Sequence, residues 1–251
     1  MNTILNISTY KFVPVADTEA LRERCLNKAQ ALELKGTLLI AEEGINLFLA
    51  GTAQAVRSFV AFLKEDPRFA DLQPKESWSA AQPFRKMLVK VKREIIRMNH
   101  PTIQPAQGRA PAVDAHTAKR WLDQGHDDQG RPVITLDTRN AFEVDYGTFE
   151  GALDWRITRF SEFPEAAQAH KAAMQDKTVI SFCTGGIRCE KAAIYLREMG
   201  LSSVYQLEGG ILKYFEEVGN AHYQGGCFVF DERESLAPDL SPTANESTLS
   251  A

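Results

Sequence analysis

The chain has 251 residues, 44% of them hydrophobic and 25% charged, with a formal net charge of −4, values typical of a globular protein large enough for two small domains. No apolar stretch reaches the roughly 18 to 20 residues that a membrane helix needs, and the N-terminus lacks the features of a signal peptide. Four cysteines are too few and too scattered for a disulfide scaffold, so we expect a cytoplasmic protein with reduced thiols and no membrane partner.

The first part of the chain alternates strands and helices. Apolar spacing predicts strands at 4–12, 37–41, 45–50, 74–80 and 86–95, and helices at 17–34 and 52–66. Glu42 and Glu43, before Gly44, are predicted turn residues between two of the strands. The order β-α-β-β-α-β is that of a ferredoxin-like α+β domain, which we assign to residues 1–96. This fold hosts many functions and identifies none.

Positive charge is concentrated in this part of the chain. Residues 1–110 hold 16 Lys and Arg against 11 Asp and Glu, whereas 111–251 hold 13 against 22. Six basic residues lie within thirteen positions: Arg85, Lys86, Lys90, Lys92, Arg93 and Arg97. Trp78 and Phe84 flank them and could stack on bases. The run is either a nucleic-acid-binding surface or an ordinary solvated strand face, and we expect Lys90, Lys92 and Arg93 to be exposed and remote from the cysteine loop described below.

The second part of the chain has a different pattern. Residues 97–112 contain three prolines and are predicted to form a linker. A helix is predicted near 113–125, followed by buried-type strands at 132–139, 177–183 and 202–207 with helices between them. This alternation predicts a parallel sheet covered on both faces, an α/β domain that we assign to residues 113–222. The C-terminal segment, 223–251, is predicted to be partly disordered, because its tail from Glu232 is rich in Ser, Pro and Thr.

The stretch "SFCTGGIRCEKAA" places Cys183 between a strand and a helix, where reactive groups of parallel sheets gather. Gly185 and Gly186 let the backbone curl so that its N–H groups point inward. Together with the helix N-terminus and Arg188, these groups favour a thiolate. A buried structural cysteine fits the pattern less well. A Cys183–Cys189 metal pair is also disfavoured, because the spacing is not a usual chelating one, and we predict no metal site.

Three stretches in this order resemble a rhodanese domain: "LDTRNAFEVDYGTFEGA", "VISFCTGGIRCEKAAIYLREMG" and "VYQLEGGILKY". Asp137 and Arg139 match the Asp-x-Arg of that family. Its sulfurtransferase-type loops have four residues between Cys and Arg, whereas phosphatase-type relatives have five. The four here are Thr184, Gly185, Gly186 and Ile187. The resemblance therefore implies sulfur chemistry rather than phosphate ester hydrolysis, with these residues and Arg188 stabilising an anion or persulfide.

Over about residues 1–233 the chain is similar to the rhodanese-related tRNA uridine hydroxylases, because "EEGIN" precedes the rhodanese-like part and "YQGGCFVFDER" follows it. The resemblance implies an enzyme that converts the wobble uridine, position 34 of tRNA, to 5-hydroxyuridine, with Cys183 as the catalytic residue. In this interpretation the first domain, residues 1–96, and its basic run hold the tRNA. The resemblance also implies molecular oxygen as co-substrate and a small-molecule oxidant or sulfur donor as a further partner. No metal or flavin motif is visible, and we predict no bound cofactor.

The residues are also compatible with two other functions. One is a thiosulfate or persulfide sulfurtransferase that acts on a protein or tRNA acceptor, which the loop length fits. The other is an RNA-binding module with an inactive rhodanese half, against which the intact Cys183 and Arg188 argue. Cys189 is either a resolving thiol or a packed helix residue. Cys25 and Cys227 are expected to be packing residues.

Overall fold

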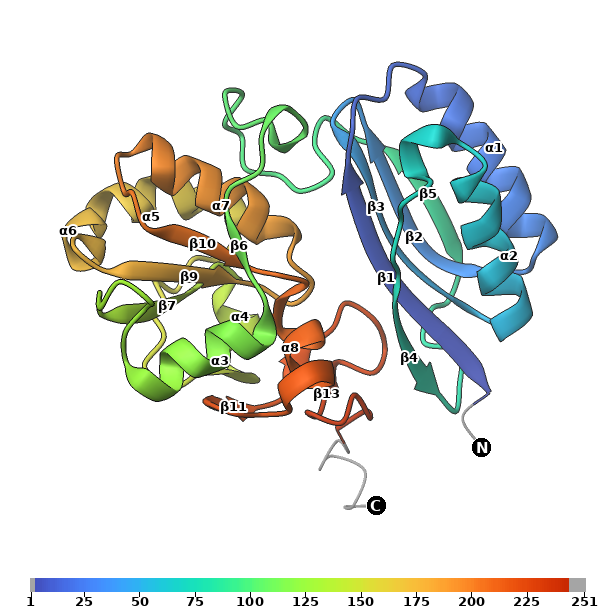
Figure 1. Ribbon diagram of the computed structural model, residues 1–251. Coiled ribbons are helices and arrows are strands. Elements are labelled where there is room, and N and C mark those ends of the chain that lie inside the picture. The colour runs from blue at the N-terminus through green and yellow to red at the C-terminus, as the bar shows by residue number, and fades with distance from the viewer. Residues whose placement is uncertain (1–2, 244–251) are drawn as a thin grey trace.

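The computed structural model describes residues 3–243, and its first unit is a five-stranded sheet with two helices on one face (Figure 1). The strands are β1 (Ile4–Phe12), β2 (Lys35–Ala41), β3 (Gly44–Gly51), β4 (Lys75–Ser79) and β5 (Met87–Val91). The helices are α1 (Thr18–Ala31) and α2 (Ala53–Lys64). The sheet order β4-β1-β3-β2-β5 confirms the predicted α+β unit, with β5 added parallel to β2.

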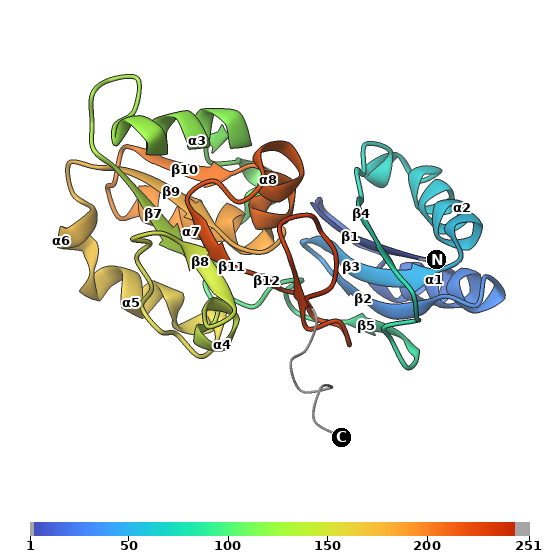
Figure 2. The ribbon, with the colours of Figure 1, turned by 90° about the horizontal axis from the view of Figure 1, so that it is seen from below.

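The two faces of this sheet have different neighbours because successive side chains of a strand point to opposite sides. Leu5 and Ile7 of β1 belong to the apolar core formed with α1 and α2, and so does Cys25, as expected. Ser8 and Tyr10 of the same strand line a cleft toward the second unit instead. Figures 1 and 2 both show this helix-free face of the sheet turned toward the second unit.

The second unit contains the predicted parallel sheet. Its order is β6-β10-β9-β7, formed by β6 (Ala112–Val113), β7 (Val133–Asp137), β9 (Thr178–Phe182) and β10 (Val204–Leu207), and every pairing is parallel. One face packs against α3 (Ala115–Gln124) and α8 (Gly210–Val218). The other packs against α5 (Phe163–Ala169), α6 (Lys171–Met174) and α7 (Ile187–Glu198). Both faces of the sheet are therefore covered, as predicted (Figure 2).

Several short elements were not predicted. Helix α4 (Ala141–Val144) follows β7, and β8 (Gly147–Phe149) pairs with β11 (Tyr223–Gly225). Three 3-10 helices lie at Pro67–Phe69, Pro105–Gln107 and Phe160–Glu162.

The predicted disorder from Glu232 is wrong for residues 232–243. Strand β13 (Ser235–Leu236) pairs there with β12 (Cys227–Phe228), and Arg233 donates a 2.7 Å hydrogen bond to the Ser77 hydroxyl of β4. Composition did not reveal these partners, which lie far away in the sequence. The rest of the tail, 244–251, lies outside the described residues.

A buried lysine joins the two units. Lys191 of α7 has a side chain that is 1% exposed, and its Nζ lies 2.8 Å from Glu43 Oε2 and 2.7 Å from Glu94 Oε2 of the first unit. Glu43 does lie in the turn between β2 and β3, as predicted, but it also makes this contact. Because a buried charge is stabilised only with its partners in place, the pairing favours one arrangement of the two units.

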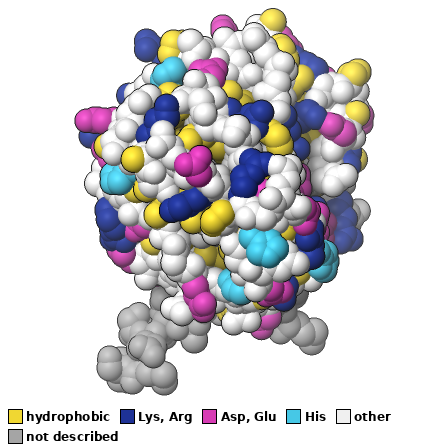
Figure 3. Space-filling model, turned by 60° about the vertical axis from the view of Figure 1, so that its left-hand side comes forward, with side chains coloured by type: hydrophobic (Ala, Val, Ile, Leu, Met, Phe, Trp, Pro, Cys, Tyr) yellow, Lys and Arg dark blue, Asp and Glu magenta, His cyan; other side chains and the backbone are white. Residues whose placement is uncertain are grey.

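The outer surface of the second unit has no single sign of charge. On the face shown in Figure 3, Lys and Arg side chains are mixed with Asp and Glu. Of the helices within residues 3–243, none combines the length and the apolar character needed to cross a membrane.

Candidate functional site

The cysteine loop lies between β9 and α7, at the carboxyl end of a central strand. Gly186 precedes α7 and has φ of 102°, a left-handed conformation that favours glycine. A Cβ at this position would also lie only 3.0 Å from the Tyr10 hydroxyl of the first unit. Glycine is thus favoured here by the turn, and a larger residue would also crowd the Tyr10 hydroxyl.

Hydrogen-bond donors from other parts of the chain bind three successive carbonyl groups of the loop. The N–H groups of Ile211 and Leu212, in the first turn of α8, donate to the carbonyls of Cys183 (2.9 Å) and Thr184 (3.1 Å). Lys75 Nζ of β4 donates to the carbonyl of Gly185 (2.8 Å). In a planar trans peptide the N–H points away from the C=O, so the following N–H groups face the inside of the loop. In agreement, the N–H of Gly186 lies 3.1 Å from Cys183 Sγ.

This environment makes Cys183 acidic. Burial alone would raise its pKa. A hydrogen bond from the Cys189 thiol, the charge of Arg188, and the backbone N–H groups of Arg188 and Cys189 outweigh burial and lower the pKa of Cys183 to about 5. The pKa of Cys189 is raised well above its usual value by burial and by Cys183. Cys189 therefore remains a protonated donor beside a thiolate.

For the other two thiols, burial is the largest influence on the pKa. Cys25 and Cys227 are both buried, and burial raises the pKa of each to about 12. We therefore expect iodoacetamide at pH 7 to alkylate Cys183 before Cys25 or Cys227, with a rate that rises to half its maximum near pH 5. Peptide mass spectrometry after timed quenching gives the order of labelling. Faster labelling of Cys25 or Cys227, or a midpoint above pH 8, would contradict a stabilised thiolate.

Arg188 is held by a carboxylate that sequence reasoning missed. Its Nη1 and Nη2 atoms lie 2.5 Å and 2.7 Å from the two carboxylate oxygens of Glu143, on α4. Both side chains are buried, and the Arg188 guanidinium holds the pKa of Glu143 below its usual range although burial opposes this shift. No local signal marks Glu143, since the two residues are 45 positions apart.

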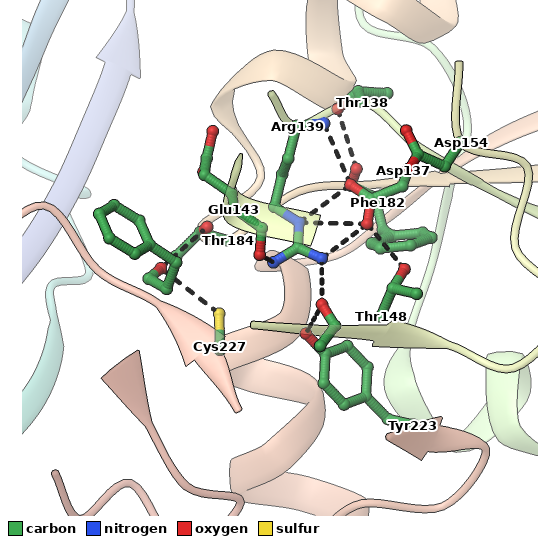
Figure 4. A network of polar contacts seen from close by, with 12 residues as sticks. Asp137, Thr138, Arg139, Glu143, Thr148, Asp154, Phe182, Thr184, Tyr223 and Cys227 are labelled. Carbon is green, nitrogen blue, oxygen red and sulfur yellow. Dashed lines mark hydrogen bonds and ion pairs between the residues drawn. The ribbon is translucent and has the colours of Figure 1, made fainter. Parts of the chain in front are cut away.

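A second buried arginine supports this pair (Figure 4). Arg139 Nη2 lies 2.6 Å from Asp137 Oδ2, and the same nitrogen donates to the carbonyl of Gly147. Its Nη1 donates to the carbonyl of Glu143 at 3.4 Å. The Asp-x-Arg motif therefore fixes the backbone that carries Glu143, and through it the guanidinium beside Cys183.

We expect Glu143→Gln to lower the free energy of unfolding by about 3–5 kcal/mol, because it leaves the buried Arg188 charge without a counter-ion. Urea unfolding at pH 7 measures the change. The matched control is Glu217→Gln, which breaks a partly exposed helix pair with Lys213 and should change stability by less than about 1 kcal/mol. Because the pKa of Glu143 is lowered in the folded protein, its stabilisation is present at neutral pH and is lost as the pH falls through that pKa. Equal changes in the free energy of unfolding for the two substitutions would show that the buried pair stabilises the protein no more than the exposed pair does.

The loop closes one end of a cleft of about 820 Å³ between the two units. Cys183 has no exposed area but is one of the lining residues, so its thiol lies at the floor. Other lining residues from the predicted site are Thr184, Gly185, Ile187, Arg188, Lys92, Arg93 and Arg97. The expectation that Lys90, Lys92 and Arg93 lie remote from the loop is therefore wrong for Lys92 and Arg93, because β5 ends beside the second unit.

The remaining predicted basic residues do not line the cleft. Arg85 forms an exposed ion pair with Glu232, and Lys86 and Lys90 are exposed. Trp78 does not line the cleft either. Side chains of a strand point alternately to the two faces of the sheet, so Trp78 of β4 points to the face opposite to that of Lys75 and Ser77. Residues that the sequence did not single out complete the lining, among them Asn140, Arg159 and Phe230.

Comparison with known proteins agrees with the two-unit architecture. A family model described as a UPF0176 acylphosphatase-like domain matches residues 4–95, and one described as a rhodanese-like domain matches residues 114–217. A protein of Variovorax paradoxus (strain S110) named tRNA uridine(34) hydroxylase is 68% identical over 251 residues, which are 100% of this chain and 95% of the relative.

Two further relatives carry the same name. The protein of Delftia acidovorans is 68% identical over 243 residues, covering 97% of this chain and 92% of the relative. That of Bordetella avium is 62% identical over 240 residues, covering 96% and 99%.

Proposed function

The chain belongs to the tRNA uridine(34) hydroxylase family, and on this premise we propose that it hydroxylates uridine 34 of tRNA with Cys183 as the reactive group. The membership confirms the resemblance found in the sequence. The observation that supports the role of Cys183 is its depressed pKa, about 5, at the floor of a cleft with Lys92, Arg93 and Arg97 along its lining. We expect the protein to act on its tRNA substrate in the cytoplasm.

The reaction replaces the hydrogen on C5 of uracil by a hydroxyl group. In our proposal the Cys183 thiolate adds to C6, which forms an S–C6 bond and moves an electron pair toward C5 and the O4 carbonyl. C5 then attacks the terminal oxygen of a hydroperoxide, formed from molecular oxygen and a two-electron donor, and the O–O bond breaks. The released oxygen atom takes the C5 proton, and departure of the thiolate restores the ring.

The residues around Cys183 suit the first of these steps. The electron pair that moves onto the uracil creates an anion, and positive charge or N–H donors fixed in advance lower the energy of such a species. Arg188 and the inward N–H groups of the loop supply both, while Glu143 keeps the guanidinium in place.

The test is mass spectrometry of nucleosides from tRNA. Purified protein, tRNA, a thiol reductant and ¹⁸O₂ should yield 5-hydroxyuridine that carries the heavy isotope, and cells without the gene should lack this nucleoside or contain less of it. No 5-hydroxyuridine from the purified protein, together with an unchanged amount of it in cells without the gene, would refute the proposed function.

A second candidate is sulfur transfer, favoured by one observation: four residues separate Cys183 from Arg188, as in loops sized for a persulfide. The same digests test it, because sulfur transfer to tRNA would yield a thiolated nucleoside instead of an oxygenated one. Release of thiocyanate from thiosulfate and cyanide would report transfer to other acceptors.

A further inference from the structure

A large aromatic ring is exposed beside the reactive thiol. Phe230, which follows β12, lines the same cleft as Cys183 and is 46% exposed. The rings of Phe142 and Phe228 meet it edge-on, with interplanar angles of 85° and 89°. Edge-to-face packing fixes the orientation of a ring. The protein therefore holds one aromatic side chain rigidly while leaving nearly half of it uncovered.

A hydrogen-bond donor without a partner lies next to this ring. Arg188 is 5% exposed and gives both terminal nitrogens to Glu143, yet its Nε–H has no hydrogen-bond partner within residues 3–243. The carbon of its guanidinium lies 6.0 Å from the centroid of the Phe230 ring. A buried donor that is left unpaired destabilises the protein, which makes a ligand acceptor at this place favourable.

We propose that Phe230 and the Nε–H of Arg188 form a pyrimidine subsite, in which the uracil ring stacks on Phe230 and one of its carbonyl oxygens accepts from Nε–H. This inference rests on the proposed function, since it names the contacts that would hold the uridine. A base taken out of its stack loses neighbouring rings, and stacking on an aromatic side chain replaces them. Uracil has two carbonyl oxygens that can accept a hydrogen bond, and the Nε–H of Arg188 has no acceptor within residues 3–243.

The charges around the ring match the rest of a nucleotide. Besides Arg188, four basic side chains line the cleft: Lys92, Arg93, Arg97 and Arg159. The carboxylate of Glu94 also lines it and shares the single charge of Lys191 with Glu43, so the basic side chains still outnumber the acidic charge at the cleft. A cleft of about 820 Å³ lies within the usual range of roughly 300–1,000 Å³ for small-ligand sites, and it leaves room for the nucleotide around a single base.

The competing explanation is packing, because Phe230 also contacts Phe48 of β3 with a centroid distance of 6.4 Å. The test therefore uses Phe230→Ala, Phe230→Tyr and, as matched control, Trp78→Ala, which removes an exposed aromatic ring outside the cleft. We expect kcat/KM for tRNA hydroxylation to fall about 5- to 150-fold in Phe230→Ala, the fold-change that corresponds to the loss of one stacked base. Phe230→Tyr should retain most of the activity, and Trp78→Ala should match the wild type.

A binding measurement separates this inference from the proposed function. An RNA stem-loop with 5-fluorouridine at the first anticodon position, bound to protein that also carries Cys183→Ser so that no adduct forms at C6, should show a ¹⁹F resonance that the ring current of Phe230 shifts on binding. The shift should vanish when Phe230→Ala is added and persist when Trp78→Ala is added, while the alkylation rate of Cys183 in the two single variants stays at the wild-type value. A shift without any 5-hydroxyuridine formation would refute the proposed function and support the subsite. Wild-type kcat/KM and an unchanged shift in Phe230→Ala would overturn the subsite, as would equal losses in Phe230→Ala and Trp78→Ala.

Discussion

Cys183→Ser is expected to abolish hydroxylation, with a loss of at least about a thousandfold, because a serine hydroxyl has far too high a pKa to replace a thiolate nucleophile. The wild-type cysteine depends on charge and N–H donors that lower its pKa to about 5, and the same surroundings cannot ionise an alcohol at neutral pH. Quantification of 5-hydroxyuridine under single-turnover conditions measures the loss. The tRNA affinity should not change, since the substitution replaces one atom on the floor of the cleft.

Cys189→Ser is the matched variant. Its hydroxyl can still donate to Cys183 Sγ, so the thiolate keeps this support, and an external thiol reductant can take over any resolving role of Cys189. We therefore expect a measurable fraction of the wild-type activity. If both variants lose activity equally, Cys189 takes part in the chemistry itself.

Reversal of the charges of Lys92, Arg93 and Arg97, each to Glu, should weaken tRNA binding at low salt on the order of a hundredfold, because phosphates near the cleft lose their counter-charges. The three side chains are exposed, and none forms an ion pair within the described part of the chain, so the fold should persist. Each phosphate contact contributes roughly 0.7–0.9 to the slope of log affinity against log salt, and the slope should become shallower by about two. Filter binding across a salt series measures both quantities.

The control uses the other half of the same segment: Arg85, Lys86 and Lys90, each changed to Glu. Both triple variants change the net charge of the protein equally, so general repulsion of RNA is the same in the two. Only the first triple removes charge from the cleft. A smaller loss in the control would support a cleft that guides the tRNA backbone, whereas equal losses would leave charge alone as the cause.

Local patterns in the chain predicted much of the site. The glycine pair after a buried strand predicted the turn at Gly186, and Arg188 was expected to face the thiol. The sequence identified the basic run as a group, but it could not show which of its residues line the cleft. Lys92 and Arg93 line the cleft and Lys90 does not, because the division depends on where β5 ends relative to the second unit.

The sequence by itself determined the order of strands and helices, the two units, the strand–loop–helix around Cys183 and the family. These features follow from the periodicity of neighbouring residues and from contiguous motifs, which are local properties of the chain. Only the tertiary structure decided the partners of the site. Glu143 meets Arg188 across 45 positions, Lys75 reaches the loop carbonyl of Gly185 across 110, and Glu43 meets Lys191 across 148. Such contacts depend on sheet order and on the packing of one unit against the other. The residues next to each partner in the sequence carry no pattern that indicates sheet order or this packing.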